Sequence, residues 1–192
     1  SDAADGEDSG RLFTLPLIAV LCAVFAANFA LSGTDLGIVA CLRSWGEVSL
    51  TGIIMSVWGV TSGLAGFTYG ALKRGFHPLL LAVILALVTA PVALARGGLW
   101  LGILVGVAGL LCAPTLASAN NAITNIVPAG RLGLAMGWYG TVGTAASALG
   151  SPLCGTVIDN FGAPAAFLLA AGVSLVLGAG GLIATRHHDL GG

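Results

Sequence analysis

Six long apolar runs without a charged residue constrain this chain more than any other feature of its sequence. The first covers Leu12–Leu31, with an extension toward Cys41 left open, and the others are Leu50–Leu72, Pro78–Ala95, Leu99–Ile126, Leu132–Leu153 and Ala163–Thr185. A helix needs about 20 residues, at about 1.5 Å of rise each, to cross the hydrocarbon core of a bilayer. The runs lack the alternation of a membrane β-strand. They predict an all-α integral membrane protein with a six-transmembrane-helix bundle over residues 11–186 and a short tail at 187–192.

The composition excludes a soluble fold. Hydrophobic residues make up 57% of the 192 residues and charged residues only 8%, whereas soluble domains carry about 25% charged residues. So much apolar surface indicates that the lipid bilayer is the main partner of the chain. A net charge of −1 gives no indication of nucleic-acid binding.

The charges that lie between the runs predict an orientation. One side collects five basic residues and the other side collects two: Arg11, Lys73, Arg74, Arg131 and Arg186 against Arg43 and Arg96. Basic residues accumulate on the cytoplasmic side. We therefore expect a multi-pass protein of the plasma (inner) membrane with both termini in the cytoplasm. Residues 1–10 are acidic, unlike the basic start of a signal peptide, and are expected to form a disordered linker.

Polar residues inside the runs are the best indicators of a substrate or proton pathway. Asn28 lies deep in the first run, and Asp35 follows before another apolar stretch. If the first helix is long, Asp35 lies inside the membrane and can bind a proton or a cationic substrate; if it ends at Ser32, Asp35 is a solvated loop residue. Asn120 and Asn121 either cap and brace the fourth helix or contact substrate.

Several other residues allow two interpretations. Trp58 and Tyr139 either line a cavity or pack in the core, and core packing is the safer interpretation. Glycine pairs at four-residue spacing favour close helix packing, although sliding helices would need the same smooth faces: Gly59/Gly63, Gly66/Gly70, Gly102/Gly106 and Gly133/Gly137. Pro114 and Pro152 are candidates for functional bends. The four scattered cysteines are interpreted as small hydrophobes, and no metal site or cofactor is predicted.

The order of several short motifs resembles the carboxy-terminal half of a major facilitator superfamily transporter, over essentially residues 11–186. Residues 66–75 resemble the glycine-and-basic loop of that family without its acidic residue, and residues 120–137 resemble a later helix turn. Residues 150–155 resemble the antiporter motif with serines in place of glycines, and residues 157–162 resemble the lead-in to the last helix. The resemblance implies a conformational or gating role for Gly66, Gly70, Lys73, Arg74, Pro152 and Gly155.

The resemblance further implies a secondary active transporter that works by alternating access. It would export or exchange a small molecule with proton coupling, as an efflux antiporter does. Its site would lie between this bundle and a second six-helix half, supplied upstream in a longer chain or by a second copy. Residues 1–10 would then be a remnant of the central cytoplasmic loop. By family position, the first and fourth helices border the central cavity.

Two other classes of membrane protein have different requirements. A self-contained six-helix channel or carrier acting as a homo-oligomer would require a native product of this length, and the chain begins with Ser1 rather than methionine. An intramembrane enzyme would require a nucleophile with a membrane histidine, or a metal-binding histidine pair. His77, His187 and His188 all lie outside the apolar runs, so the sequence predicts that the protein is not an enzyme.

Overall fold

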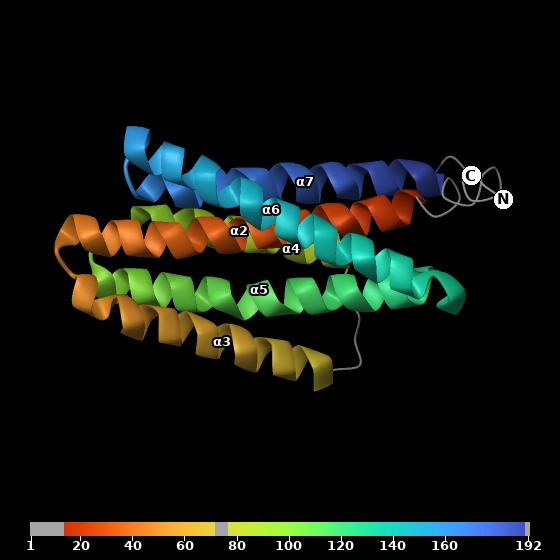
Figure 1. Cartoon of the computed structure of the whole chain (residues 1–192), viewed down its shortest axis with the longest axis horizontal. Helices are drawn as coiled ribbons and strands as arrows, with labels where there is room; N and C mark the ends of the chain where they lie inside the picture. Colours follow the sequence, from red (N-terminus) through yellow and green to blue (C-terminus); the bar gives the residue numbers. More distant parts are fainter. Residues whose placement is uncertain (1–13, 72–76, 191–192) are drawn as a thin grey trace.

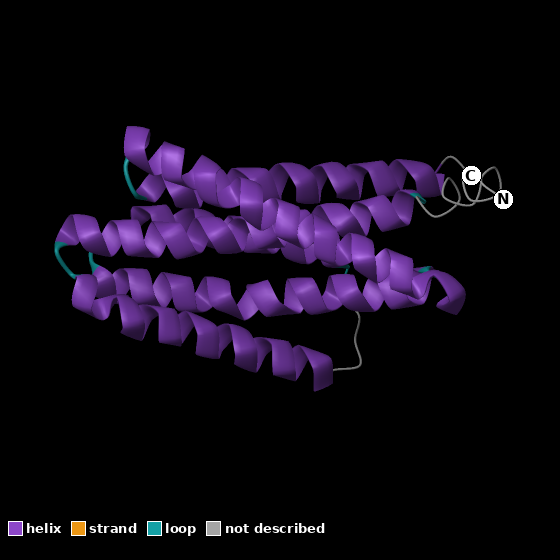
Figure 2. Cartoon of the chain, in the orientation of Figure 1, coloured by secondary structure: helices purple, strands orange, loops and turns teal. Residues whose placement is uncertain are grey.

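The computed structural model describes residues 14–71 and 77–190, and all regular structure within these ranges is helical (Figures 1 and 2). The long helices are α2 (Leu15–Trp45), α3 (Thr51–Ala71), α4 (Pro78–Thr89), α5 (Gly98–Ile126), α6 (Leu132–Phe161) and α7 (Pro164–Leu190). Short 3₁₀ turns are η1 (Val48–Leu50), η2 (Ala90–Leu94) and η3 (Ala129–Arg131). The predicted all-α six-helix bundle is confirmed. The predicted linker at residues 1–10 lies outside the described residues.

Among the residues that the structure describes, five helices are long and apolar enough to cross a membrane: Leu15–Trp45, Val48–Ala71, Gly98–Ile126, Ala129–Phe161 and Pro164–Ala184. The third predicted run forms a shorter apolar helix, Pro78–Leu94, which consists of α4 and η2. Twelve α-helical and five 3₁₀ residues span about 28 Å, close to the thickness of the hydrocarbon core of about 30 Å.

Local signals in the sequence set the helix ends. Proline occupies the first turn of α2 and of α4 and opens α7, where its missing N–H costs nothing. Gly46 ends α2 in the left-handed conformation at φ 74°, and its N–H donates to the carbonyl of Arg43. That conformation suits a residue without a Cβ atom. Helix α2 therefore continues well past Ser32, and the alternative in which the first helix ends at Ser32 is wrong.

Helix α2 lies at the centre of the bundle, where it packs against α7, α6, α5 and α4 (Figure 1). Its contact with α7 is very close. A Cβ atom at Gly33 would lie 2.8 Å from Cβ of Ala170, and one at Gly37 would lie 2.7 Å from the ring of Phe167. Only glycine permits this approach, so the two helices pack backbone to side chain along this seam.

Helix α3 lies at the edge of the bundle and packs chiefly on α5 (Figure 1). A Cβ atom at Gly109 would lie 2.7 Å from the indole of Trp58, and one at Gly66 would lie 2.9 Å from Cβ of Ala113. The expected glycine packing holds at Gly66 and at the pair Gly102/Gly106, where a built Cβ atom would lie 3.6 Å from Ile54 and 3.3 Å from Val57. It fails elsewhere, because no atom of a packed neighbour lies within 4 Å of a Cβ built at the following positions: Gly59, Gly63, Gly70, Gly133 and Gly137.

Candidate functional site

Asp35 lies within α2, ten residues before its last residue Trp45, and its side chain is half-buried. It is five residues beyond Ala30, the centre of the helix, which corresponds to about 7.5 Å. The hydrocarbon core extends about 15 Å to each side of its midplane, so a centred α2 places this carboxylate inside the core. A charged group at such a depth is by default a hypothesis for a functional site.

The Asp35 carboxylate lies within electrostatic range of the buried thiol of Cys112 on α5. Within the described ranges, no residue forms a hydrogen bond or an ion pair with the carboxylate. A carboxylate taken out of water without a partner is costly, and a proton or a bound cation removes that cost. The first helix is the long one of the two alternatives, and binding of a proton or a cation at Asp35 stays a prediction.

Asn28, Ser32 and Asp35 follow one another at intervals of four and three residues, which places them on one face of α2. The Asn28 side-chain amide donates to the carbonyl of Val24 at 2.9 Å, and the Ser32 hydroxyl donates to the carbonyl of Asn28 at 3.2 Å. Both bonds stay within the helix. They leave the amide oxygen of Asn28 as a hydrogen-bond acceptor on this polar face.

A hollow of about 340 Å³ lies beside Asn28, between α2, α5 and α6. We call it the polar groove. Its lining residues combine hydroxyl groups, one amide and backbone close to the surface: Asn28, Leu116, Tyr139, Gly140, Gly143, Thr144 and Ser147. The hydroxyl of Tyr139 donates to the carbonyl of Leu116 on α5 at 3.4 Å. The groove therefore offers both hydrogen-bond donors and acceptors, which would suit a small polar molecule.

A break in the helix hydrogen bonding lies close to the polar groove. Pro114 is buried inside α5 and cannot donate to the preceding turn. The hydroxyl of the next residue, Thr115, donates to the carbonyl of Leu111 at 2.6 Å. Such hydroxyl bonds are how membrane helices tolerate proline. The predicted bend residue therefore lies two residues before Leu116, which lines the polar groove.

The remaining residues predicted for the pathway lie apart from the polar groove. Trp58 packs against Gly109 at the contact of α3 with α5, in agreement with the core interpretation. Asn120 and Asn121 are exposed near the end of α5, and the carbonyl of Asn121 accepts a hydrogen bond from Thr124 at 2.8 Å. Among these predicted residues, Asn28 and Tyr139 are brought together in one hollow. Asp35 lies two turns further along the same face of α2.

The predicted gating residues are dispersed. Gly66 packs on α5, whereas Gly70 faces open space. Pro152 is exposed inside α6, which continues through it to Phe161 rather than ending near Leu153. Gly155 also faces open space. Lys73 and Arg74 lie outside the described residues.

Sequence reasoning missed the groove residues Gly143, Thr144 and Ser147, and it missed Ser32 on the polar face of α2. The spacing of Ser32 after Asn28 was the one available signal. Three of the cysteines, Cys41, Cys112 and Cys154, are buried, and Cys22 is half-buried. In the part of the chain that the structure describes, no group of three or more metal-ligating side chains forms.

A sequence model of the Major Facilitator Superfamily matches residues 12–189. The chain belongs to this family. Its members are multi-pass membrane transporters and not enzymes, so the major facilitator fold accounts for both the helical bundle and the intramembrane polar residues. No curated protein and no solved structure matches the chain. The assignment to a substrate or to one half of the major facilitator fold therefore rests on the residues of this chain.

Proposed function

We propose that this chain is the carboxy-terminal six-helix half of a secondary transporter, which exports or exchanges a small molecule by alternating access with proton coupling. The observation that carries the proposal is the half-buried Asp35 carboxylate, which lies inside α2 without a described partner. In major facilitator proteins, substrate and coupling-ion sites lie near the bilayer midplane between two helical bundles. A centred α2 would put Asp35 about 7.5 Å from the midplane, which supports the proposal.

A single carboxylate supports exchange on physical grounds. Its negative charge can be neutralised in the membrane either by a proton or by a cationic group of the substrate. The two occupants compete, because each removes the same charge. Binding of a proton on one side of the membrane then favours release of the substrate there, which is the elementary step of an antiporter.

The polar groove would hold the uncharged part of the substrate. Asn28 offers an amide to the groove and Tyr139 a hydroxyl, and Asp35 follows Asn28 on the same face of α2. The groove is open on one side, so a second six-helix half would be needed to enclose it. That half would come from an upstream segment of a longer chain or from a second copy.

The orientation is part of the proposal. Helix α2 begins and α7 ends at the same end of the bundle (Figure 1), and Arg131 lies in η3 at this end. The basic residues on this side support a cytoplasmic location of that end in the plasma (inner) membrane.

The test is substrate-induced proton movement in vesicles that contain the full protein and a pH-sensitive dye, screened against a panel of organic cations and neutral metabolites. We expect the wild type and Asp35→Glu to couple proton flux to at least one cation, and Asp35→Asn to lose this coupling. Coupling that is unchanged in Asp35→Asn would contradict the proposal. Non-saturating flux from a native product of this length would favour the homo-oligomeric channel instead.

A further inference from the structure

One narrow face of the central helix α2 is left partly uncovered by its neighbours. In the stretch 27–37, the half-buried residues are Asn28, Leu31, Ser32, Asp35 and Leu36, and the others are buried. Their intervals of three and four residues are those of a single helix face. A ligand that lies along this face therefore meets the amide of Asn28 and the carboxylate of Asp35 together.

The helix fixes the spacing between these two groups. Asn28 and Asp35 are seven residues apart, which corresponds to a rise of about 10.5 Å. Seven residues also return the side chains to within about 20° of each other around the helix axis. Asparagine and aspartate side chains have the same length, and α2 is continuous from Leu15 to Trp45. The spacing of the two polar groups therefore follows the rise of the helix.

The two ends of this face select different chemical groups. Asp35 is the only charged residue of α2 before Arg43, and a cationic group neutralises such a carboxylate in the membrane. The polar groove beside Asn28 has no charged lining residue. A charged group in the groove would stay unpaired at a high cost, so this end suits a neutral group.

The polar groove retains the capacity to donate and to accept hydrogen bonds. The bond from Tyr139 to the carbonyl of Leu116 is 3.4 Å long, beyond the usual distance of about 2.8 Å, so its hydroxyl exchanges partners easily. The Thr144 hydroxyl donates to the carbonyl of Gly140 at 2.9 Å, which leaves its oxygen as an acceptor. Ser147 forms no hydrogen bond with any residue that the structure describes. A primary amide, which donates and accepts side by side, matches this lining.

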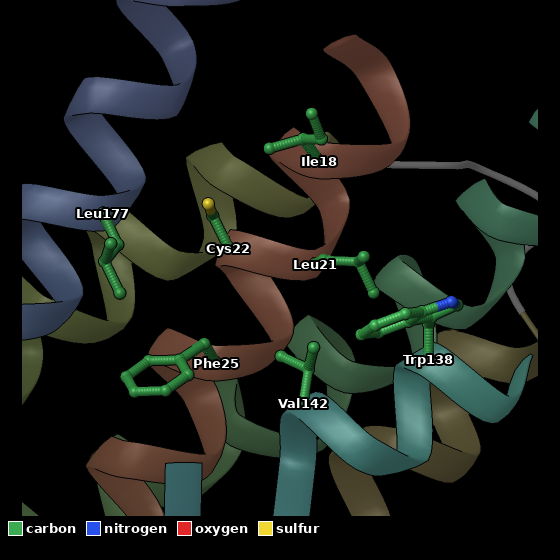
Figure 3. Close-up of a pocket in the computed structure, with 7 residues that line it drawn as sticks. All are labelled: Ile18, Leu21, Cys22, Phe25, Trp138, Val142 and Leu177. Atoms are coloured by element: carbon green, nitrogen blue, oxygen red, sulfur yellow. The ribbon is translucent and has the colours of Figure 1, made fainter. Parts of the chain in front are cut away.

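The parts of this face between and beside the two ends need no polar partner. Between them, Leu31 is apolar and the Ser32 hydroxyl already donates to the carbonyl of Asn28. Toward the start of α2, Phe25 shares a hollow with Trp138 of α6, and no charged, hydroxyl or amide side chain lines that hollow (Figure 3). The middle of a bound ligand is therefore expected to be hydrocarbon.

We infer that the substrate is an elongated organic monocation, in which an apolar chain separates a basic nitrogen from a neutral amide or hydroxyl group by about 10 Å. The nitrogen binds at Asp35 and the neutral group binds in the polar groove beside Asn28. This inference rests on the proposed function, because it names the substrate class of the same site.

The experiment measures the binding of ω-amino primary amides of increasing length to the full protein in detergent by isothermal titration calorimetry. An extended chain advances about 1.2 Å per bond, so about eight methylene groups place the two ends of the ligand at the required spacing. Alkylamines of equal length keep the cation and lack the amide. They correct for the tighter binding of longer chains through burial alone. The ratio of the amine Kd to the amino-amide Kd should peak near about eight methylene groups, at roughly tenfold.

Variants of the groove test the neutral end separately. Tyr139→Phe and Ser147→Ala should lower the peak ratio toward about one while the alkylamines bind as before, because only the amide loses hydrogen bonds. Thr141→Ala removes an exposed hydroxyl of α6 that does not line the groove, and it should keep the wild-type peak. Monodisperse elution checks that each variant folds.

Moving the acid tests the spacing itself. Asp35→Asn combined with Val39→Asp displaces the carboxylate by four residues along the same face, about 6 Å. The peak should then move to chains about five methylene groups longer. A ratio that is flat across the wild-type series, or a peak that stays in place in the well-folded double variant, would overturn the inference. A peak at the expected length in a protein without proton coupling would support the substrate class and contradict the antiport step, so the two proposals fail separately.

Discussion

Asn28 of α2 and Gly143 of α6 lie in direct contact at the polar groove: a Cβ atom at Gly143 would be 3.2 Å from the side-chain nitrogen of Asn28. The contact explains how an amide on the central helix reaches the groove, because the absent side chain at position 143 leaves room for it. Gly140, one turn earlier on α6, also lines the groove but has open space above its Cα atom.

The first prediction concerns this contact. Gly143→Ala should displace the Asn28 side chain by a few tenths of an ångström, and so lower the apparent substrate affinity in transport assays by roughly two- to tenfold, since small displacements of positioning groups are costly. Gly140→Ala is the matched control and should transport normally. An unchanged affinity in Gly143→Ala, with the protein folded, would show that Asn28 does not contact the substrate.

The packing of α3 on α5 gives a second prediction. A Cβ atom at Gly109 would lie 2.6 Å from the hydroxyl oxygen of Thr61 and 3.0 Å from the carbonyl oxygen of Trp58. The backbone atom cannot move aside easily, so Gly109→Ala should destabilise the protein by about 1–3 kcal/mol. Thermal unfolding in detergent measures this loss. Gly63→Ala adds a methyl group in open space on α3 and should leave the unfolding midpoint unchanged or slightly raised.

A third prediction concerns the contact between the end of α2 and the start of α5. The carboxylate of Glu47 accepts a hydrogen bond from the backbone N–H of Gly98 at 2.7 Å, and Gly98 opens α5. A carboxylate at a helix amino terminus satisfies an otherwise unpaired donor and interacts well with the helix dipole. Glu47→Ala should therefore lower the free energy of unfolding by about 1 kcal/mol.

The charge and the hydrogen bond of Glu47 can be separated. Glu47→Gln keeps an acceptor and should cost less than Glu47→Ala. Asp159→Asn alters an exposed acid near the end of α6 and should have almost no effect. Equal stability of Glu47→Ala and Asp159→Asn in chemical or thermal unfolding would contradict a capping role.

The fourth prediction addresses a buried hydrogen bond between the central helix and the last helix. The hydroxyl of Ser174 is fully buried and donates to the carbonyl of Ala26 at 3.1 Å. Hydrogen bonds between membrane helices contribute about 0.6 kcal/mol on average. Ser174→Ala should destabilise by about that amount, measured by unfolding in mixed micelles. Exposed Thr141, whose hydroxyl bonds within its own helix, provides a control through Thr141→Ala, which should be close to neutral.

The sequence predicted those features of the fold that depend on local composition. The apolar runs predicted six helices, because transfer of backbone and side chains into lipid depends on composition over about 20 residues. The local sequence does not determine the end of the first helix, since the segment Ser32–Gly33–Thr34 is compatible with either a turn or a tightly packed helix. Contact of Gly33 with Ala170 shows that packing on α7 favours the helix, and such a tertiary contact has no signature in the local sequence.

The candidate site was predicted only in part for the same reason. Asn28 and Asp35 were identified because a polar residue in an apolar run is conspicuous. Gly143 was not identified, because a glycine in a glycine-rich helix gives no sign of what faces it. The pairs Gly59/Gly63 and Gly133/Gly137 satisfied the packing pattern yet face open space, since spacing indicates a smooth face without indicating which helix covers it.

Helices α2 and α7 pack closely along the seam that Gly33 and Gly37 form with Ala170 and Phe167. Neither helix can therefore rotate about its axis without the other. Asp35 lies between the two glycines of the seam in the sequence, and Val176 on the outer surface of α7 is 71% exposed. Any rotation that swings the carboxylate from one side of the membrane toward the other must therefore drag the outer surface of α7 through the surrounding acyl chains. We expect the viscosity of the bilayer to slow each such rotation.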